Sequence, residues 1–205
     1  MKKIIVFLSL IFLTVFTSCG KEKSTLDIFW ENLKEANSYE VDVKSKRDFP
    51  PYKFNLDTHM KRDGNKFYTN AYLLFKEEVL FDDEIYAALN GQESVDVYRK
   101  ENDAFVKKNY PLGPDFVDIS LKFNISSSDF TFDKEANAYE MKKETLKKLT
   151  FTIKEYTLSV SSLRITDIND TSANLKAYIA YNSIQFPVYI DIYNINQAKV
   201  ELPNV

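Results

Sequence analysis

Few residues of this chain could carry catalysis or hold a metal ion. The 205 residues include one cysteine, Cys19, and one histidine, His59. A disulfide framework, a zinc site built from cysteine and histidine, and most catalytic sites that depend on histidine are therefore excluded. His59 falls on the polar side of an alternating segment, where an ordinary surface residue is expected.

Clusters of carboxylates are the other residues that could do chemistry. Asp82, Asp83 and Glu84 are adjacent, and paired acids alone suffice for glycoside hydrolysis. The pattern around them indicates a turn, in which acidic residues are usually only solvated. The segment 167–170 has the character of a calcium loop, but Ser172 stands where an EF-hand requires glycine.

Motifs for cofactor binding and for common catalytic machinery are also absent. The chain has no P-loop, no Gly-x-Gly-x-x-Gly, no His-Glu-x-x-His and no Gly-x-Ser-x-Gly. Hydrophobic residues make up 44% and charged residues 28%, which indicates a folded chain rather than a disordered one. The net charge of -3 gives no basic excess for nucleic acid. We therefore expect no enzymatic activity, no cofactor and no nucleic-acid partner.

The position of Cys19 indicates a modification. A short basic start is followed by an uncharged apolar stretch, residues 4–16, which is shorter than the ~20 residues that a membrane-spanning helix needs. Such a stretch is typical of a secretory signal. Phe16, Thr17 and Ser18 then lead to Cys19, and this ending resembles the lipobox of bacterial lipoproteins. The resemblance implies cleavage after Ser18 and acylation of Cys19, such as by palmitate.

The alternative for this segment is an ordinary cleaved signal that contains a cysteine, which leaves an unpaired thiol in a secreted protein unexplained. We therefore expect a lipoprotein signal peptide at residues 1–18, a polar tether at 19–24 and a single folded domain at 25–205. The expected location is the cell envelope, outside the cytoplasm, with a lipid anchor in a bacterial membrane. More than one acyl chain holds a protein on a bilayer far better than one does.

One helix is expected near the start of the folded domain. Four apolar residues fall at positions i, i+3, i+4 and i+7, which places them on one face of a helix. Ser24 lies three positions before Asp27, the spacing of a capping box, and Asn37 with Ser38 ends the segment. The four apolar residues are Leu26, Phe29, Trp30 and Leu33.

The rest of the chain is expected to form mainly strands. From Tyr39 onward apolar residues recur at every second position, and residues 63–65 and 90–91 are turns. Prolines and a glycine between Asn109 and Ser128 predict a long loop that acts as a lid, and a brief helix is expected at 144–149. The expected strands are residues 39–43, 54–60, 66–75, 78–81, 84–89, 95–100, 104–107, 130–133, 138–142, 150–160, 163–168, 173–181, 184–192 and 199–202.

The order of segments resembles the lipoprotein-carrier family of LolA, LolB and the mycobacterial lipoproteins LppX and LprG. The likeness covers most of residues 25 to 203 and rests on local patterns. These are a helix that runs directly into the first strand (33–39), a basic hairpin corner (60–68), a charged turn before an aromatic strand (81–86), and the order of the final segments (139–141, 149–153 and 163–167).

This resemblance implies an α+β fold that is mainly β, in which a long curved antiparallel sheet forms an unclosed half-barrel. An N-terminal helix and a short helix or loop lid are expected on the concave side. Family members carry or hold lipids or acylated proteins, and an apolar hollow shields acyl chains from water. The residues expected to line it are Trp30, Leu33, Leu56, Phe67, Leu73, Ile85, Val97 and Ile179.

The resemblance and the signal together predict a membrane-anchored lipoprotein that binds or carries a lipid or an acylated protein without catalysis. The alternative is a cell-envelope interaction module that binds a protein or a polysaccharide through the exposed face of its sheet. A basic cluster is expected to be a solvated helix face, and its other possible role is contact with anionic lipid head groups. Its members are Lys142, Lys143, Lys147 and Lys148.

Overall fold

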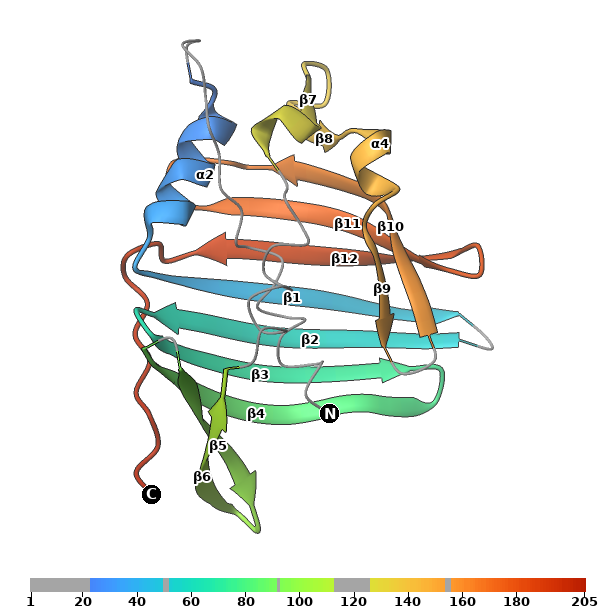
Figure 1. Ribbon diagram of the computed structural model, residues 1–205. Helices are drawn as coiled ribbons and strands as arrows, with labels where there is room; N and C mark the ends of the chain where they lie inside the picture. Colours follow the sequence, from blue (N-terminus) through green and yellow to red (C-terminus); the bar gives the residue numbers. More distant parts are fainter. Residues whose placement is uncertain (1–22, 50–51, 92, 113–125, 154–155) are drawn as a thin grey trace.

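The fold is built around one antiparallel β-sheet (Figure 1). The computed structural model describes residues 23–49, 52–91, 93–112, 126–153 and 156–205. Eleven strands follow one another in the order β6-β5-β4-β3-β2-β1-β12-β11-β10-β8-β7, and β9 pairs with β10. The strands are β1 (Ser38–Phe49), β2 (Tyr52–Asp63), β3 (Lys66–Phe75), β4 (Glu78–Asn90), β5 (Ser94–Glu101), β6 (Ala104–Pro111), β7 (Phe130–Asp133), β8 (Ala138–Met141), β9 (Thr150–Ile153), β10 (Tyr156–Thr166), β11 (Ala173–Tyr181) and β12 (Ile184–Tyr193).

The sheet does not close into a barrel, because its path ends at β6 on one side and at β7 on the other. The expected fold class is therefore confirmed: the protein is mainly β, with an unclosed antiparallel sheet and an N-terminal helix. The helical segments of the described ranges are α2 (Thr25–Glu35), α4 (Lys143–Leu146) and the 3-10 turn η2 (Ser127–Asp129).

Helix α2 begins where the sequence predicts. The Asp27 backbone N–H donates to Ser24 Oγ at 3.2 Å, and the Ser24 N–H donates to Asp27 Oδ2 at 2.9 Å. This is a capping box, which satisfies backbone donors that a helix start otherwise leaves free. The predicted apolar stripe is buried: Leu26, Phe29, Trp30 and Leu33.

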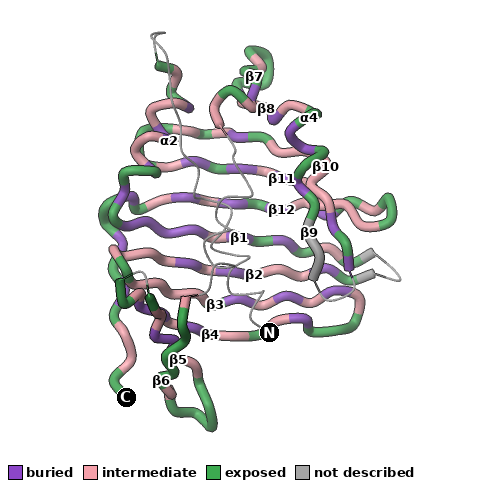
Figure 2. The backbone as a smooth tube through the Cα atoms, viewed as in Figure 1, coloured by how far each residue is buried: buried purple, intermediate pink, exposed green. Residues whose placement is uncertain are grey.

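The two faces of the sheet differ in polarity. Along β1, Val41 is buried, and the neighbouring Asp42 lies on the opposite face. Residues directly opposite one another in an antiparallel pair share a face, and Val41 pairs with Ile192 and with Met60, which are both buried. Phe29 of α2 belongs to the same hydrophobic core, so the helix covers this apolar face. Buried residues alternate with more exposed ones along β12 and along parts of β1 and β11 (Figure 2).

The sheet bends so that the face against α2 is concave. β10 lies five steps from β3 in the sheet order, which is about 24 Å in a flat sheet. The ring of Tyr156 in β10 nevertheless lies 4.9 Å from the ring of Phe75 in β3. A register shift between Val160 and Ser162 marks an irregularity at which β10 can bend. We call the face against α2 the concave face and the other the convex face.

Some boundaries differ from those expected. β4 runs without a break from Glu78 to Asn90, although three adjacent acids indicate a turn within it. Residues 150–160 divide between β9 and β10, and β6 extends to Pro111, into the expected loop. Residues 199–202 form no strand, because the backbone N–H of Val200 donates to the Asp63 carboxylate at 3.3 Å instead of to a neighbouring strand. Residues 113–125 of the expected lid lie outside the described ranges.

The hairpin of β5 and β6 contains a carboxylate whose ionised form is favoured by folding. Asp96 is 8% exposed and accepts hydrogen bonds from Asn109 Nδ2 at 2.8 Å and from Lys107 Nζ at 2.9 Å. Hydrogen bonds from the side chains of Asn109, Asn90 and Lys107 lower the pKa of Asp96 from 3.8 to about 2. The folded state therefore holds this group as a carboxylate at pH values where the unfolded chain protonates it.

We expect Asp96→Asn to make the stability of the protein less sensitive to acid. Because the folded-state pKa is depressed, the stabilisation by ionised Asp96 is complete above about pH 4 and is lost as the pH falls through about 2. The free energy of unfolding, measured by denaturant titration across this pH range, should fall less steeply in the variant. Asn109→Ala removes the main donor and should flatten the slope in the same direction. An unchanged slope in Asp96→Asn would contradict this assignment.

Candidate functional site

The helices of the described ranges cover only part of the concave face. Eleven strands at ~4.8 Å spacing span about 48 Å, whereas the 11 residues of α2 form a helix about 16 Å long. The core around α2 draws on β1 and on β10 to β12 and reaches β2 to β4, where it includes Leu73 and Leu80, but it includes no residue of β5. α4 consists of four residues and packs on β10, so it adds no cover near β5.

The concave side of β2 to β5, which we call the β2–β5 surface, carries two apolar patches. The strand register defines them, because each patch is a row of residues that lie opposite one another on successive strands. They are the Leu56 patch (Leu56, Leu73 and Phe81) and the Phe67 patch (Phe67, Ala87 and Val97).

The large side chains of both patches are only partly covered, and those of the Leu56 patch also pack with the core around α2. Leu56, Phe67 and Phe81 are half-buried, whereas Leu73 and Val97 are 9% and 7% exposed. In the Phe67 patch, the small side chain of Ala87 lies between the larger ones of Phe67 and Val97. An apolar surface with partly exposed large side chains is the kind of surface that binds hydrocarbon in water.

A polar strip separates the two patches. Thr58 lies opposite Ala71, which lies opposite Asp83, and Thr69 and Arg99 follow in the next row. The guanidinium of Arg99 forms an ion pair with the Asp83 carboxylate. The strip (Thr58, Thr69, Asp83 and Arg99) brings one charged pair to the β2–β5 surface, while the Thr58 hydroxyl within it is buried. Arg62, which lies opposite Phe67, is a further charged residue on this side of the sheet.

The eight residues expected to line a cavity lie in two regions. Trp30 and Leu33 are buried on α2, and Ile179 on β11 packs against the same core. The other five lie on the β2–β5 surface: Leu56, Phe67, Leu73, Ile85 and Val97. Contact of these eight residues with a ligand stays a prediction.

Asp83 and Arg99 are missing from the residues expected to form the site. Three adjacent acids indicate a solvated turn, but the structure places Asp83 within β4. The period of two carries the missing signal, because Asp83 is in phase with Phe81 and Ile85. Arg99 is likewise in phase with Val97 on β5.

The four lysines predicted to contact a membrane lie in and beside α4. Lys143, Lys147 and Lys148 are exposed in and beside α4, and Lys142 Nζ donates to the Ser128 carbonyl at 2.6 Å. Their contact with lipid head groups stays a prediction. Cys19, the expected lipidation site, lies outside the described residues.

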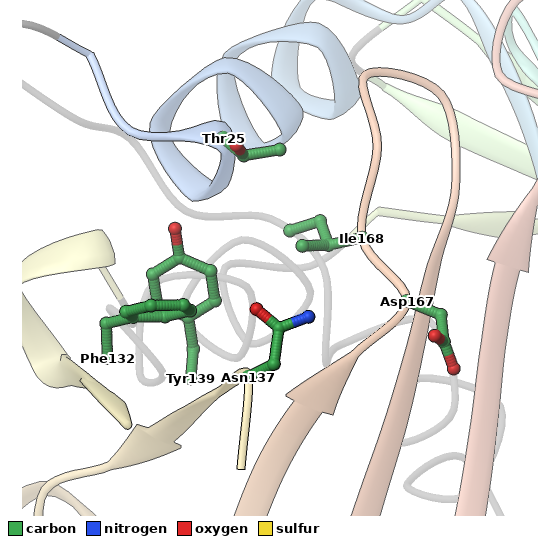
Figure 3. Close-up of a pocket in the computed structure, with 6 residues that line it drawn as sticks. All are labelled: Thr25, Phe132, Asn137, Tyr139, Asp167 and Ile168. Atoms are coloured by element: carbon green, nitrogen blue, oxygen red, sulfur yellow. The ribbon is translucent and has the colours of Figure 1, made fainter. Parts of the chain in front are cut away.

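A small pocket lies beside the start of α2 (Figure 3). Its volume is about 210 Å³, which is below the ~300 Å³ at the lower end of small-molecule sites. The rings of Phe132 and Tyr139 lie 4.9 Å apart along one side. None of the predicted cavity residues lines this pocket, which is formed by Thr25, Phe132, Asn137, Tyr139, Asp167 and Ile168.

The convex face carries a network of charged side chains. His59 Nδ1 lies 2.6 Å from Asp42 Oδ1, and Lys61 Nζ lies 3.2 Å from Glu40 Oε2. Burial and then the carboxylates of Asp42 and Glu40 raise the pKa of Tyr193 to about 12. The His59 side chain is 30% exposed within this network, so it lies on the polar side of its strand as the alternation predicts.

The described parts of the chain contain no helix that is long and apolar enough to cross a bilayer. Within the same ranges, no three side chains of His, Cys, Asp or Glu are grouped closely enough to hold a metal ion.

Comparisons with known proteins give only distant similarities, and these are in structure. No protein-family model matches the chain, and no curated protein matches it. The structure is similar to the crystal structure of the Mycobacterium tuberculosis lipoprotein LppX, with 11% sequence identity and a TM-score of 0.33. The match covers 84% of this chain and 93% of that chain. A likeness at this level carries no inference about ligands or partners.

Thr58 in the polar strip gives a test of the geometry of this surface. Its side chain is 0% exposed, and its hydroxyl has no hydrogen-bond partner among the residues that the structure describes. A buried hydroxyl without a partner costs about 1–3 kcal/mol of stability. Thr145, which is 7% exposed, differs because its hydroxyl donates to Asp129 Oδ1 at 2.7 Å.

We expect Thr58→Val to raise the free energy of unfolding by about 1 kcal/mol, because valine keeps the shape and removes the unpartnered hydroxyl. Thr145→Val is the matched control and should lower it by about 1.5–3 kcal/mol, because it removes a hydrogen bond to a carboxylate. Denaturant unfolding of both variants measures the difference. Destabilisation by Thr58→Val as large as that by Thr145→Val would mean that the Thr58 hydroxyl has a partner.

Proposed function

We propose that this protein binds the acyl chain of a lipid or of an acylated protein on its concave face, and that it does so without catalysis. The observation that supports the proposal is the β2–β5 surface, on which the large apolar side chains of Leu56, Phe67 and Phe81 stay partly exposed. Sheet faces of this polarity are normally packed against another layer, because exposing them to water is unfavourable. An acyl chain is an occupant with the right chemistry.

The transfer of an acyl chain from water to this surface can supply enough free energy for binding. Each methylene group moved from water to an apolar surface contributes about 0.8 kcal/mol, so ten of them contribute about 8 kcal/mol before the cost of association. The Leu56 patch and the Phe67 patch supply aliphatic and aromatic side chains for this contact. No reacting group on the protein is needed for uptake or release.

The proposal includes a tether and one folded unit. Residues 25–205 would form a single binding domain, held by residues 19–24 close to a membrane of the cell envelope. Acylation of Cys19 would keep the binding surface near a supply of lipid or of acylated protein. The exposed lysines beside α4 would add attraction to anionic head groups, each contributing about 1 kcal/mol near the surface.

We expect Cys19→Ala to abolish metabolic labelling of the protein with palmitate and to shift it from the membrane fraction to the soluble fraction. The reason is that a protein without acyl chains loses the apolar contact that anchors it. Fractionation and labelling of the wild-type and variant chains in the same bacterial host measure both effects. Labelling that persists in Cys19→Ala would rule out Cys19 as the lipidation site.

A second candidate function uses the convex face. Tyr189 is 48% exposed there, and Lys176 Nζ lies 5.5 Å from its ring centre and 5.2 Å from that of Tyr178. Exposed aromatic side chains beside a charge are typical of surfaces that bind proteins or polysaccharides. Under this alternative, Tyr189→Ala would weaken binding to an envelope component, and acyl-chain binding would be absent.

Two leucines on opposite faces of neighbouring strands distinguish these functions. Leu56 on β2 faces the concave side, Leu74 on β3 faces the convex side, and both are half-buried. We expect Leu56→Gln to weaken binding of a fluorescent fatty acid about tenfold or more, because it places an amide among apolar side chains. Leu74→Gln, the control, should leave the affinity unchanged. Equal effects of the two substitutions in a titration would argue against a ligand on the concave face.

A further inference from the structure

The ion pair of Asp83 and Arg99 lies on the concave face of the sheet, where apolar residues are expected. Arg99 pairs in register with Ile85, and Asp83 with Ala71, so both charged side chains share the concave face with apolar neighbours. The side chain of Asp83 is 29% exposed and that of Arg99 is 33% exposed, so solvent or a ligand can reach them.

The next residues along β4 and β5 form an ion pair on the charged, convex face. Glu84 and Lys100 lie on the convex face, with Lys100 Nζ 2.8 Å from Glu84 Oε2. The same two strands therefore carry one ion pair on each face. Partly exposed pairs add only about 0–1 kcal/mol, and apolar residues on a buried face usually stabilise at least as well. Stability alone therefore does not explain charges at the Asp83 and Arg99 positions.

The surroundings of Arg99 suit the polar end of an amphiphile. A guanidinium has five N–H donors, and within the described residues it forms one ion pair, with Asp83. Two further cations face the concave side: Arg62 on β2, opposite Phe67, and Lys108 on β6, opposite Val97, which pairs with Glu101. From the row of Arg99 and Thr69, the Leu56 patch begins four residues along β3, at a distance of about 13 Å.

We propose that Arg99 binds the anionic head group, a carboxylate or a phosphate, of an acyl-chain ligand whose tail lies on the Leu56 patch. This inference rests on the proposed function and adds the class and orientation of the ligand. Asp83 holds the guanidinium in place on the concave face and competes with the ligand anion for its donors. Guanidinium groups bind carboxylates and phosphates through paired N–H donors, which gives the head group a defined position.

Photo-crosslinking of the full chain tests this proposal. The probes are palmitic acid, the matching lysophosphatidate and the matching long-chain alcohol, each with a diazirine in the tail, and peptide mass spectrometry locates the crosslinks. The wild-type chain should be labelled within β2 and β3 by the acid, by the phosphate probe or by both, more strongly than by the alcohol. The stronger of the two anionic probes identifies the head group as carboxylate or phosphate.

Substitutions of opposite expected sign separate binding from structure. Arg99→Gln should reduce the ratio of anionic to alcohol labelling about tenfold, the effect of one charge-assisted hydrogen bond. Asp83→Asn should raise this ratio, because the competing carboxylate is gone. Lys100→Gln, which breaks the neighbouring pair on the convex face, should leave it unchanged.

The outcomes distinguish failure of the head-group site from failure of the proposed acyl-chain binding. If Arg99→Gln and Asp83→Asn change the ratio in the same direction, or if Lys100→Gln acts like Arg99→Gln, the head-group site is wrong while acyl-chain binding stands. If none of the probes labels β2 or β3 in any chain, the proposed function itself fails.

Discussion

The structure depends on one constraint: a long sheet with one apolar face must keep that face out of water. The convex side is charged, with His59 and Asp42 in its network, so it can remain in solvent. The concave side cannot, and α2 is too short to cover it. Helix α2 covers part of this face, and the bend of β10 covers another part.

The cover is uneven, and the unevenness creates the candidate site. At one end, the bend of β10 brings Tyr156 onto Phe75, where Phe186 and Phe54 complete an aromatic cluster. Over β1 and β10 to β12, the stripe of α2 fills the core. On the β2–β5 surface, large apolar side chains of two patches stay partly exposed on either side of a polar strip. A ligand with a long apolar tail and a charged end would match this arrangement in polarity.

The sequence predicts the local features well, because they depend on near neighbours. The α2 capping box follows from the spacing of Ser24 and Asp27, and the turn after β2 follows from Gly64, whose φ of 60° suits glycine. The continuity of β4 could not be predicted from composition, since three adjacent acids usually favour a turn. Their place in a strand depends on partners in β3 and β5, such as Arg99, which are distant in sequence. The site is therefore predictable as an apolar surface but not in its charged part.

The central claim is that the concave face holds an acyl chain. Native mass spectrometry of the chain without residues 1–19, isolated from bacteria under gentle conditions, tests it most directly. The account predicts a population whose extra mass matches a lipid or fatty acid, and release of that mass on collisional activation. A protein that carries no such mass, even after incubation with long-chain lipids, would contradict the claim.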